Sequence, residues 1–350
     1  MKSTITLPGM IDIHAHFRDP AETESEDFFT GTCSALAGGV VTVFDMPNTD
    51  PPVFTIKALE EKMSIAKGKA VSDFGLYFGS DGKNTDQFLK VANRVVGLKV
   101  FLNESTGNLT VSDDVSLETI FSSWPPSRVI VVHAEGEMIE KSIALAKTFG
   151  NKLHITHIST QKALTAIIEA KKNSMTVTCD VTPHHLFLSK EDMDRRGHMA
   201  VHPQLGESDD RDFLWNNLSA IDCIASDHAP HTKKEKQKGA AGFPGIETTL
   251  PLLFTAVKEG KMTTEDVVRL TYDGPTQIFS LPHDPTTYID IDIDEKSTLK
   301  AESQYSKCNW TPYEGMTVYG KVRSVVIRGT LAYMDGTILV DPGFGKNIKE

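Results

Sequence analysis

The residues of this sequence that could do chemistry are histidines and aspartates at the ends of short apolar runs. The first run ends in His14-Ala15-His16, and side chains two positions apart in an extended strand point to the same side. Four later runs end in single polar residues: His133, His157, Asp180 and Asp227. Each of these residues, taken singly, is more often a hydrogen-bonded loop residue than a ligand. Together they predict a metal centre, because a shared metal offsets the desolvation of buried imidazoles and carboxylates.

Lys99 is the one cation inside a run, residues 96–102, that we expect to be buried on both faces. An unpaired ammonium in that position is costly. Either the side chain reaches the end of the strand as a structural cation, or its amine is modified or paired at the metal.

These residues require strands that bring their ends together. Eight β-branched runs occur, at residues 9–16, 40–46, 71–79, 97–102, 128–133, 152–157, 175–180 and 221–226. Segments of helical composition alternate with them, at 25–37, 56–67, 85–95, 138–149 and 160–172, and Thr23 with Glu26 resembles a capping box for the first helix. Eight β–α alternations with continuous apolar strands predict a TIM (β/α)8 barrel, whose catalytic groups lie at the carboxyl ends of the strands. An open doubly wound sheet is the alternative, but no G-x-G-x-x-G follows the first strand.

The pattern changes after residue 260. One more helix is expected at 264–279, followed by short strands at 288–293, 318–328 and 331–340. We therefore predict a barrel over residues 1–280 and a small C-terminal β appendage over residues 281–350 packed on it. The charge run 233–238 is expected to be a solvated loop without function.

Composition limits the class of partner. The chain has 350 residues with 36 Lys and Arg against 47 Asp and Glu, a formal net charge of -11, which argues against binding nucleic acid. No window approaches the apolar length of a membrane span, and the start lacks a signal-peptide pattern. We expect a cytoplasmic protein with a small-molecule substrate and no membrane partner.

Four motifs together resemble dihydroorotases, which belong to the amidohydrolase superfamily. They are His14-Ala15-His16 after residues 7–12, Met46-Pro47-Asn48-Thr49, Gly97-Leu98-Lys99, and Ser226-Asp227-His228-Ala229-Pro230-His231. Segments 178–186, 242–245 and 310–315 are most similar to the dihydroorotase domain of the multifunctional pyrimidine-synthesis protein of animals. The resemblance implies a zinc-dependent hydrolase that interconverts N-carbamoyl-L-aspartate and L-dihydroorotate in de novo pyrimidine synthesis. It also implies a homodimer, with carbamoyl-phosphate synthetase and aspartate transcarbamylase domains in the same polypeptide.

The resemblance assigns metal ligands residue by residue. One zinc would be held by His14, His16 and Asp227, and a second by His133 and His157. Lys99 would bridge both ions as a carbamate formed with carbon dioxide, and Asp227 would relay a proton to the leaving ring nitrogen. Asp180, which takes the place of a glutamate of the animal domain, is a candidate ligand for a third zinc.

The same resemblance implies the substrate contacts. Arg18, Asn48 and His231 would recognise the ring carboxylate, and His202 and Gly242 are expected beside them, with His202 where the animal domain has arginine. The loop hydroxyls of Ser105 and Thr106 would close over the substrate as catalytic-loop residues, and solvated turn residues are the alternative for this pair.

Two other functions share the motifs. Hydantoinases, dihydropyrimidinases and allantoinases have the same barrel and ligands, but Arg18 and Asn48 favour a substrate with a ring carboxylate. A catalytically impaired dihydroorotase-like domain with a structural role is the second alternative, and the presence of every principal ligand argues against it. Because the chain begins almost directly at the first barrel strand, we expect a domain of a larger polypeptide.

Overall fold

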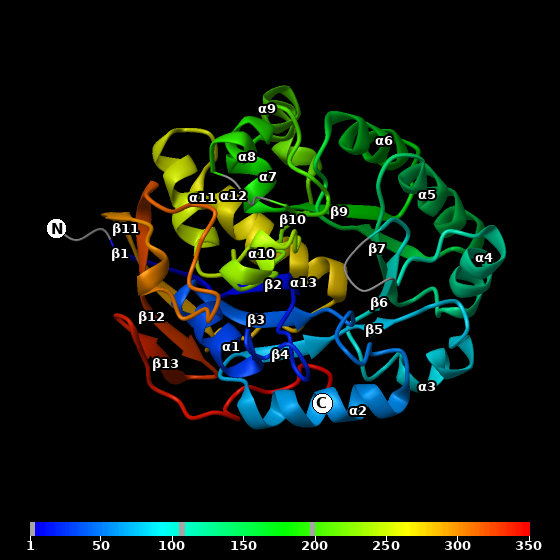
Figure 1. Ribbon diagram of the computed structural model, residues 1–350, viewed down its shortest axis with the longest axis horizontal. Coiled ribbons are helices and arrows are strands. Elements are labelled where there is room, and N and C mark those ends of the chain that lie inside the picture. Colours follow the sequence, from blue (N-terminus) through cyan, green and yellow to red (C-terminus); the bar gives the residue numbers. More distant parts are fainter. Residues whose placement is uncertain (1–3, 105–108, 197–199) are drawn as a thin grey trace.

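The computed structural model describes residues 4–104, 109–196 and 200–350. Its centre is a ring of parallel strands surrounded by helices, with a separate antiparallel sheet on one side (Figure 1). Within the described residues, no helix is both long enough and apolar enough to cross a membrane.

The barrel strands follow one another around the ring in sequence order. They are β2 (Met10–Ala15), β3 (Val40–Asp45), β4 (Asp73–Leu76) continued by β5 (Phe78–Gly79), β6 (Leu98–Phe101), β7 (Val129–His133), β8 (Lys152–Ile155), β9 (Val177–Val181) and β10 (Cys223–Ile224). Tyr77 separates β4 from β5, so the predicted strand 71–79 is present in two pieces. The order confirms the predicted (β/α)8 barrel.

The ring closes between β10 and β2. Ala15 forms a parallel bridge with His228, and the backbone N–H of His16 donates to the carbonyl of His228 at 2.8 Å. One buried carboxylate reinforces this seam, because Asp12 Oδ1 accepts from the backbone N–H groups of His14 and Ser226, each at 3.1 Å. The strand that carries the first two candidate ligands is thereby fixed to the chain that carries Asp227.

Helices cover the outside of the ring. They are α1 (Phe28–Ala37), α2 (Ile56–Lys69), α3 (Phe88–Val91), α4 (Asp114–Ser123), α5 (Glu137–Phe149), α6 (Gln161–Lys172), α7 (Pro183–Phe187), α8 (Lys190–Arg196), α9 (Ser208–Asn216), α10 (Lys233–Gln237), α11 (Thr249–Lys258), α12 (Thr264–Val268) and α13 (Gly274–Phe279). Short 3-10 turns are η1 (Thr85–Gln87), η2 (Leu218–Ala220) and η4 (Ala301–Ser303), and a π turn, η3 (Arg269–Asp273), joins α12 to α13 within the predicted helix 264–279.

Two local expectations were wrong. The first helix is capped by Asp27 and Thr30, not by Thr23 and Glu26, because Glu26 is fully buried and bonds Thr30 and Ser306. The charge run 233–238 is not a solvated loop: it forms the short helix α10, and Lys236 within it is buried.

The predicted β appendage is present, with five strands where three were expected, because an N-terminal strand joins it and the predicted strand 331–340 is divided in two. Its strands are β1 (Thr4–Pro8), β11 (Tyr288–Thr298), β12 (Thr317–Ile327), β13 (Thr330–Met334) and β14 (Thr337–Ile338), all antiparallel to their neighbours. The N-terminal strand β1 pairs with β11, although we had assigned residues 1–280 to the barrel. Its half-exposed residues gain backbone partners on the free edge of β11.

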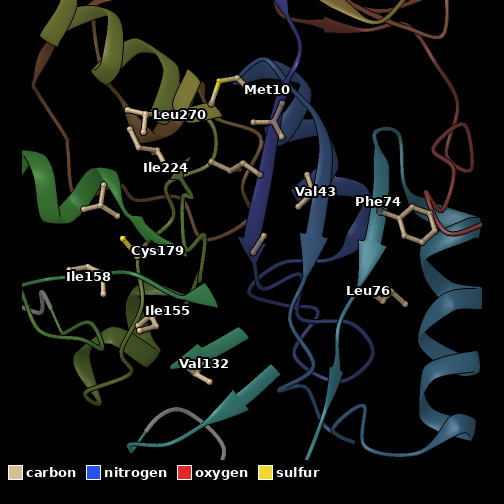
Figure 2. Packing of buried hydrophobic residues seen from close by; sticks show 14 of the residues in the cluster. Met10, Val43, Phe74, Leu76, Val132, Ile155, Ile158, Cys179, Ile224 and Leu270 are labelled. Carbon is tan, nitrogen blue, oxygen red and sulfur yellow. The ribbon is translucent and has the colours of Figure 1, made fainter. Parts of the chain in front are cut away.

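The main core lies between the strands and the helices (Figure 2). It includes Met10, Val43, Phe74, Val132 and Ile155, all at most 3% exposed. The appendage packs on this body where β12 meets α11, and Gly320 allows the approach because a Cβ there would lie 2.8 Å from the Cβ of Phe254. The four cysteines are all buried and unpaired.

Candidate active site

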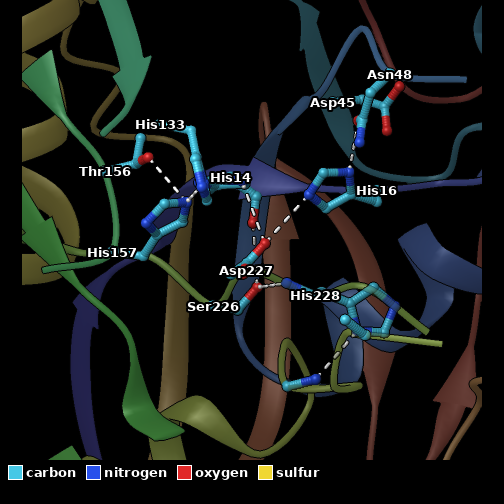
Figure 3. Close-up of polar contacts among 12 residues, drawn as sticks. His14, His16, Asp45, Asn48, His133, Thr156, His157, Ser226, Asp227 and His228 are labelled. Carbon is cyan, nitrogen blue, oxygen red and sulfur yellow. Dashed lines mark hydrogen bonds and ion pairs between the residues drawn. The ribbon is translucent and has the colours of Figure 1, made fainter. Parts of the chain in front are cut away.

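The predicted strand ends meet at one mouth of the barrel (Figure 3). His14 Nε2 and His16 Nε2 lie 3.2 and 3.1 Å from the same oxygen, Asp227 Oδ1. On the opposite side, His133 Nδ1 lies 3.0 Å from His157 Nε2. One ligand atom each from His14, His157 and Asp227 falls within 4.8 Å of the other two, a spacing that a single metal ion could bridge.

Two of these residues have strained backbone conformations. His157 has φ 42° and Asp227 has φ 46°, in the left-handed region that side chains with a Cβ rarely adopt. The backbone N–H of His157 is held there by Asp180 Oδ1 at 2.7 Å. Such strain persists where surrounding bonds enforce it, and it is concentrated at functional sites.

The protonation states suit a metal. Burial lowers the pKa of His14, His16 and His157 well below the usual range, so these imidazoles are neutral and carry the lone pairs that metals bind. Burial also raises the pKa of Asp227 to about 7. Among the described residues, the Nδ1 atoms of His14 and His157 are buried without a hydrogen-bond partner. Nitrogen and oxygen donors without a thiolate therefore fit zinc or another divalent ion.

Lys99 is completely buried in β6. Its Nζ donates to Thr156 Oγ1 at 3.2 Å and lies 5.2 Å from the centre of the Phe101 ring. Burial lowers the pKa of Lys99 to about 7, so a large fraction of this amine is neutral and nucleophilic at physiological pH. The Lys99 amine is therefore buried beside Thr156 and Phe101, and both interpretations of this cation stay predictions.

Arg18 is the buried cation beside the candidate ligands. Its Nε donates to Pro230 O at 3.0 Å, and Nη2 lies 3.1 Å from His231 Nε2. Its side chain is only 4% exposed, and its one ion-pair partner in the described residues, Glu22, is half exposed at 3.5 Å. Burial lowers the pKa of Arg18, and the charges of Glu22, Asp227, Glu235 and Asp45 oppose this change, so the guanidinium is held rigidly near several carboxylates.

Nine of the predicted site residues line one pocket. It is lined by His14, His16, Arg18, Asn48, Phe101, His133, His157, His202, Asp227, Ala229, Ala241 and Gly242. His202 contributes an exposed side chain. Gly242 has φ 139°, and a Cβ there would lie 2.5 Å from Ala229 O, so only glycine fits this wall.

Asn48 and His231 lie at the edge of the pocket in positions that orient other groups. His16 Nδ1 lies 2.8 Å from Asn48 Oδ1, so a proton on Nδ1 leaves Nε2 free toward the ligand cluster. His231 Nε2 is 3.0 Å from Ala241 O as well as close to Arg18. His231 is not one of the pocket-lining residues. It contacts two residues that are, Arg18 and Ala241.

Five predicted residues are not among the pocket-lining side chains: Lys99, Ser105, Thr106, Asp180 and His231. Ser105 and Thr106 lie outside the described residues. Asp180 lies behind His157, where its Oδ1 accepts from the His157 backbone and its Oδ2 lies 2.8 Å from His154 Nε2. Both of its carboxylate oxygens are therefore bonded within the chain.

Sequence reasoning missed several residues that support the site. Asp45 accepts from the backbone N–H of Phe17 at 2.7 Å and forms a buried ion pair with Lys62. His154 contacts Asp180, and Phe101 lines the pocket. The available signal was a charged or polar residue inside an apolar strand, which Asp12, Asp45 and His154 all share with Lys99.

A parallel (β/α)8 barrel whose strand ends gather histidines, an aspartate and a buried lysine defines a metal-dependent hydrolase class. The chain matches the Amidohydrolase family over residues 5–284 and belongs to that family. It is 38% identical to a dihydroorotase of Pyrococcus horikoshii, over 100% of this chain and 86% of the relative. It is 43% identical to the multifunctional protein CAD of Squalus acanthias, over 99% of this chain but only 16% of that protein. These relatives confirm the resemblance to dihydroorotases.

Solved structures agree on the fold. An L-hydantoinase (dihydropyrimidinase) from Arthrobacter aurescens superposes with a TM-score of 0.93 at 26% identity, over 98% of this chain and 88% of the other. An inactive dihydroorotase-like domain of a CAD-like multifunctional protein from Chaetomium thermophilum gives 0.85 at 28% identity, over 98% and 99% of the two chains.

Proposed function

We propose that this chain is a zinc-dependent dihydroorotase that interconverts L-dihydroorotate and N-carbamoyl-L-aspartate in de novo pyrimidine synthesis. The observation that carries the proposal is the shared pocket: a buried, rigidly held Arg18 lies beside a cluster of neutral histidines and Asp227. A guanidinium is a suitable partner for the substrate's carboxylate. The cluster of histidines and Asp227 is suited to act on the amide bond of the same small ring.

Two zinc ions fit the donor set. His14, His16 and Asp227 would hold one, and His133 and His157 the other. Zinc at this centre supplies Lewis acidity toward a carbonyl oxygen and acidifies water. Both carboxylate oxygens of Asp180 are already hydrogen-bonded within the chain. We propose a third ion at this residue as a secondary assignment, and the measured metal content tests it.

Lys99 would bridge the two ions as a carbamate. Its neutral amine adds to carbon dioxide, a nitrogen–carbon bond forms, and one proton is released to solvent. The product replaces a buried cation with an anion, which is the charge that a site for two divalent ions needs. The lowered pKa of Lys99 supports this step because only the neutral amine can react.

The chain's own residues divide the remaining work. Arg18, oriented by Pro230 O and His231, holds the substrate carboxylate. Asp227 accepts a proton from the attacking water and delivers it to the ring nitrogen as the carbon–nitrogen bond breaks. A pKa of about 7 suits a group that must both accept and donate at neutral pH. The hydroxyls of Ser105 and Thr106 would contact the substrate from the loop.

The test is turnover of dihydroorotate by protein purified with zinc, together with its metal content. We expect hydrolysis and at least two ions per chain. Fewer than one ion per chain, or no turnover by fully loaded protein, would contradict the proposal.

The hydantoinase-type function is the second candidate, and the close superposition on the Arthrobacter hydantoinase favours it. Hydantoin and dihydrouracil lack the ring carboxylate, so preference for them over dihydroorotate would support it. An inactive structural domain, as in the Chaetomium relative, is less compatible with a chain in which His14, His16, His133, His157 and Asp227 all line the pocket.

Assembly and location are further parts of the proposal. We expect a homodimer in the cytoplasm, with neighbouring carbamoyl-phosphate synthetase and aspartate transcarbamylase domains, as the similarity to CAD suggests. Analytical ultracentrifugation tests the dimer, and sequencing of the full transcript tests the neighbours.

A further inference from the structure

Lys236 is a buried cation that the proposed chemistry does not use. It lies in α10, within the charge run 233–238, yet its side chain is only 4% exposed. Its Nζ donates to three backbone carbonyls: Ala200 O at 2.6 Å, Ala240 O at 2.7 Å and Gly242 O at 3.0 Å. An ammonium has three donors, so all of them are used.

Aromatic rings complete the surroundings of this ammonium. Nζ lies 5.2 Å from the centre of the Phe243 ring and 5.3 Å from that of Trp310. In the described part of the chain no carboxylate forms an ion pair with it. Burial lowers the pKa of Lys236 to about 8, so the group still carries its charge at neutral pH. A buried charge without a counter-ion is costly, and the three carbonyl bonds and the two ring contacts offset that cost here.

The three carbonyls belong to two segments that form the wall of the active-site pocket. Ala200 lies two residues before His202, and Ala240 and Gly242 lie on either side of Ala241 in the pocket-lining loop. The Gly242 N–H also donates to Ala200 O at 3.0 Å, so the ammonium and this bond connect the same two segments.

The positive charge of Lys236 also acts on His231, which is proposed to help hold the substrate carboxylate. Burial is the main cause that lowers the pKa of His231, to about 3, so this imidazole is neutral; the charges of Arg18 and Lys236 lower the pKa further, and the charge of Glu235 opposes them. Trp310 Nε1 donates to His231 O at 2.6 Å, which ties the same aromatic group to this histidine. Arg18 and the Lys236 ammonium therefore both act electrostatically on His231.

We propose that Lys236 is a positioning residue for an anionic substrate: it cross-links the two pocket-wall segments and supplies uncompensated positive charge behind His231. The inference rests on the proposed function, because it takes the ring carboxylate as the recognised group. It predicts an effect on substrate binding and none on the metal ligands, which Lys236 does not touch.

The test compares Lys236→Met with Lys234→Met, an exposed lysine of the same helix. We expect Lys236→Met to raise the KM for dihydroorotate roughly tenfold while kcat changes less than about threefold. Metal content should equal that of the wild type. Lys234→Met should match the wild type in every measurement.

Hydrogen–deuterium exchange supplies a readout that is independent of turnover. In Lys236→Met, amides of residues 200–206 and 240–243 should exchange faster, and those of the barrel strands should not. If Lys236→Met does not fold, Lys236→Gln, which keeps two N–H donors, is measured with the same expectations.

The outcomes separate the two proposals. If wild type and Lys234→Met hydrolyse no dihydroorotate, the proposed function fails, and the exchange measurement alone decides on Lys236. If the folded Lys236 variant has a KM within about twofold of wild type, or loses kcat with KM unchanged, the positioning role is wrong. A lowered melting temperature with unchanged KM would show a role in stability only.

Discussion

Two candidate ligands at the pocket, His16 and His157, are each held by a neighbouring group. His16 is held by Asn48, and His157 is held through its backbone by Asp180, which in turn contacts His154. Such partners fix which ring nitrogen faces a metal and commonly change metal affinity when they are removed. The arrangement gives Asn48 and Asp180 a positioning role that does not require either to contact metal or substrate.

Asp227 carries the clearest catalytic prediction. Asp227→Asn keeps the shape of the side chain but cannot accept a proton, so kcat should fall on the order of 10²- to 10⁴-fold with a smaller change in KM. Metal content must be measured on the same sample because Asp227 also contacts the ligand cluster. A fully loaded variant with normal kcat would exclude the proton-transfer role.

Lys99 tests the carbamate. Lys99→Ala should reduce turnover by at least about a hundredfold and lower the bound metal, while circular dichroism should be unchanged, because the removed ammonium has only one hydrogen bond, to Thr156. The exposed Lys162 gives a matched control, Lys162→Ala. Near-normal turnover in Lys99→Ala would refute the assignment.

At the scale of elements, the position of the site could be predicted because a parallel barrel has one catalytic face. A histidine or aspartate that follows an apolar run must lie on that face, which is why the ligands and Arg18 were found from spacing and motif. The burial of Lys236 could not be predicted, because a run of charges next to glycine is usually solvated and one of its carbonyl partners, Ala200 O, belongs to a segment 36 residues away.

The same limit explains the two structural surprises. The pairing of β1 with β11 joins segments about 285 residues apart, and no local pattern in Thr4–Pro8 specifies it. The cap of α1 was misplaced because Glu26 has a suitable spacing from Thr23, and only the fold shows that it is used by Ser306 instead.

The seam between β2 and β10 gives a prediction about stability. Asp12→Ala would leave the buried N–H groups of His14 and Ser226 without an acceptor, which should cost roughly 2–4 kcal/mol. Asp12→Asn keeps the Oδ1 acceptor and should cost much less. Urea denaturation of both variants checks this, and equal stabilities would show that Asp12 does not fasten the seam.

At the scale of the whole molecule, the protein has a formal net charge of -11, yet its proposed substrate is an anion of the same sign. The charge distribution reconciles the two, because Arg18 and Lys236 place buried positive charge at one pocket while the acidic excess belongs to the rest of the chain. Recognition of the anion is therefore local and depends on a few rigid contacts.

Metal binding should also be visible in the stability of the whole protein. An ion that binds only the folded state stabilises it by about 2.7 kcal/mol at a hundred times its Kd. Chelator-treated protein should therefore melt at a lower temperature and recover when zinc is added. Recovery should be weaker in Asp227→Asn, and equal melting curves with and without zinc would contradict a metal centre.

The most direct test of the account is the ratio of kcat/KM for dihydroorotate to that for dihydrouracil, measured for wild type and for Arg18→Lys. The two rings differ in the carboxylate that Arg18 is proposed to hold. We predict that the wild type prefers dihydroorotate by at least about a hundredfold, and that Arg18→Lys loses most of this preference, because an ammonium keeps the charge without the planar fork. Equal rates on both substrates, or an unchanged ratio in Arg18→Lys, would contradict the proposal that this pocket recognises the carboxylate of dihydroorotate.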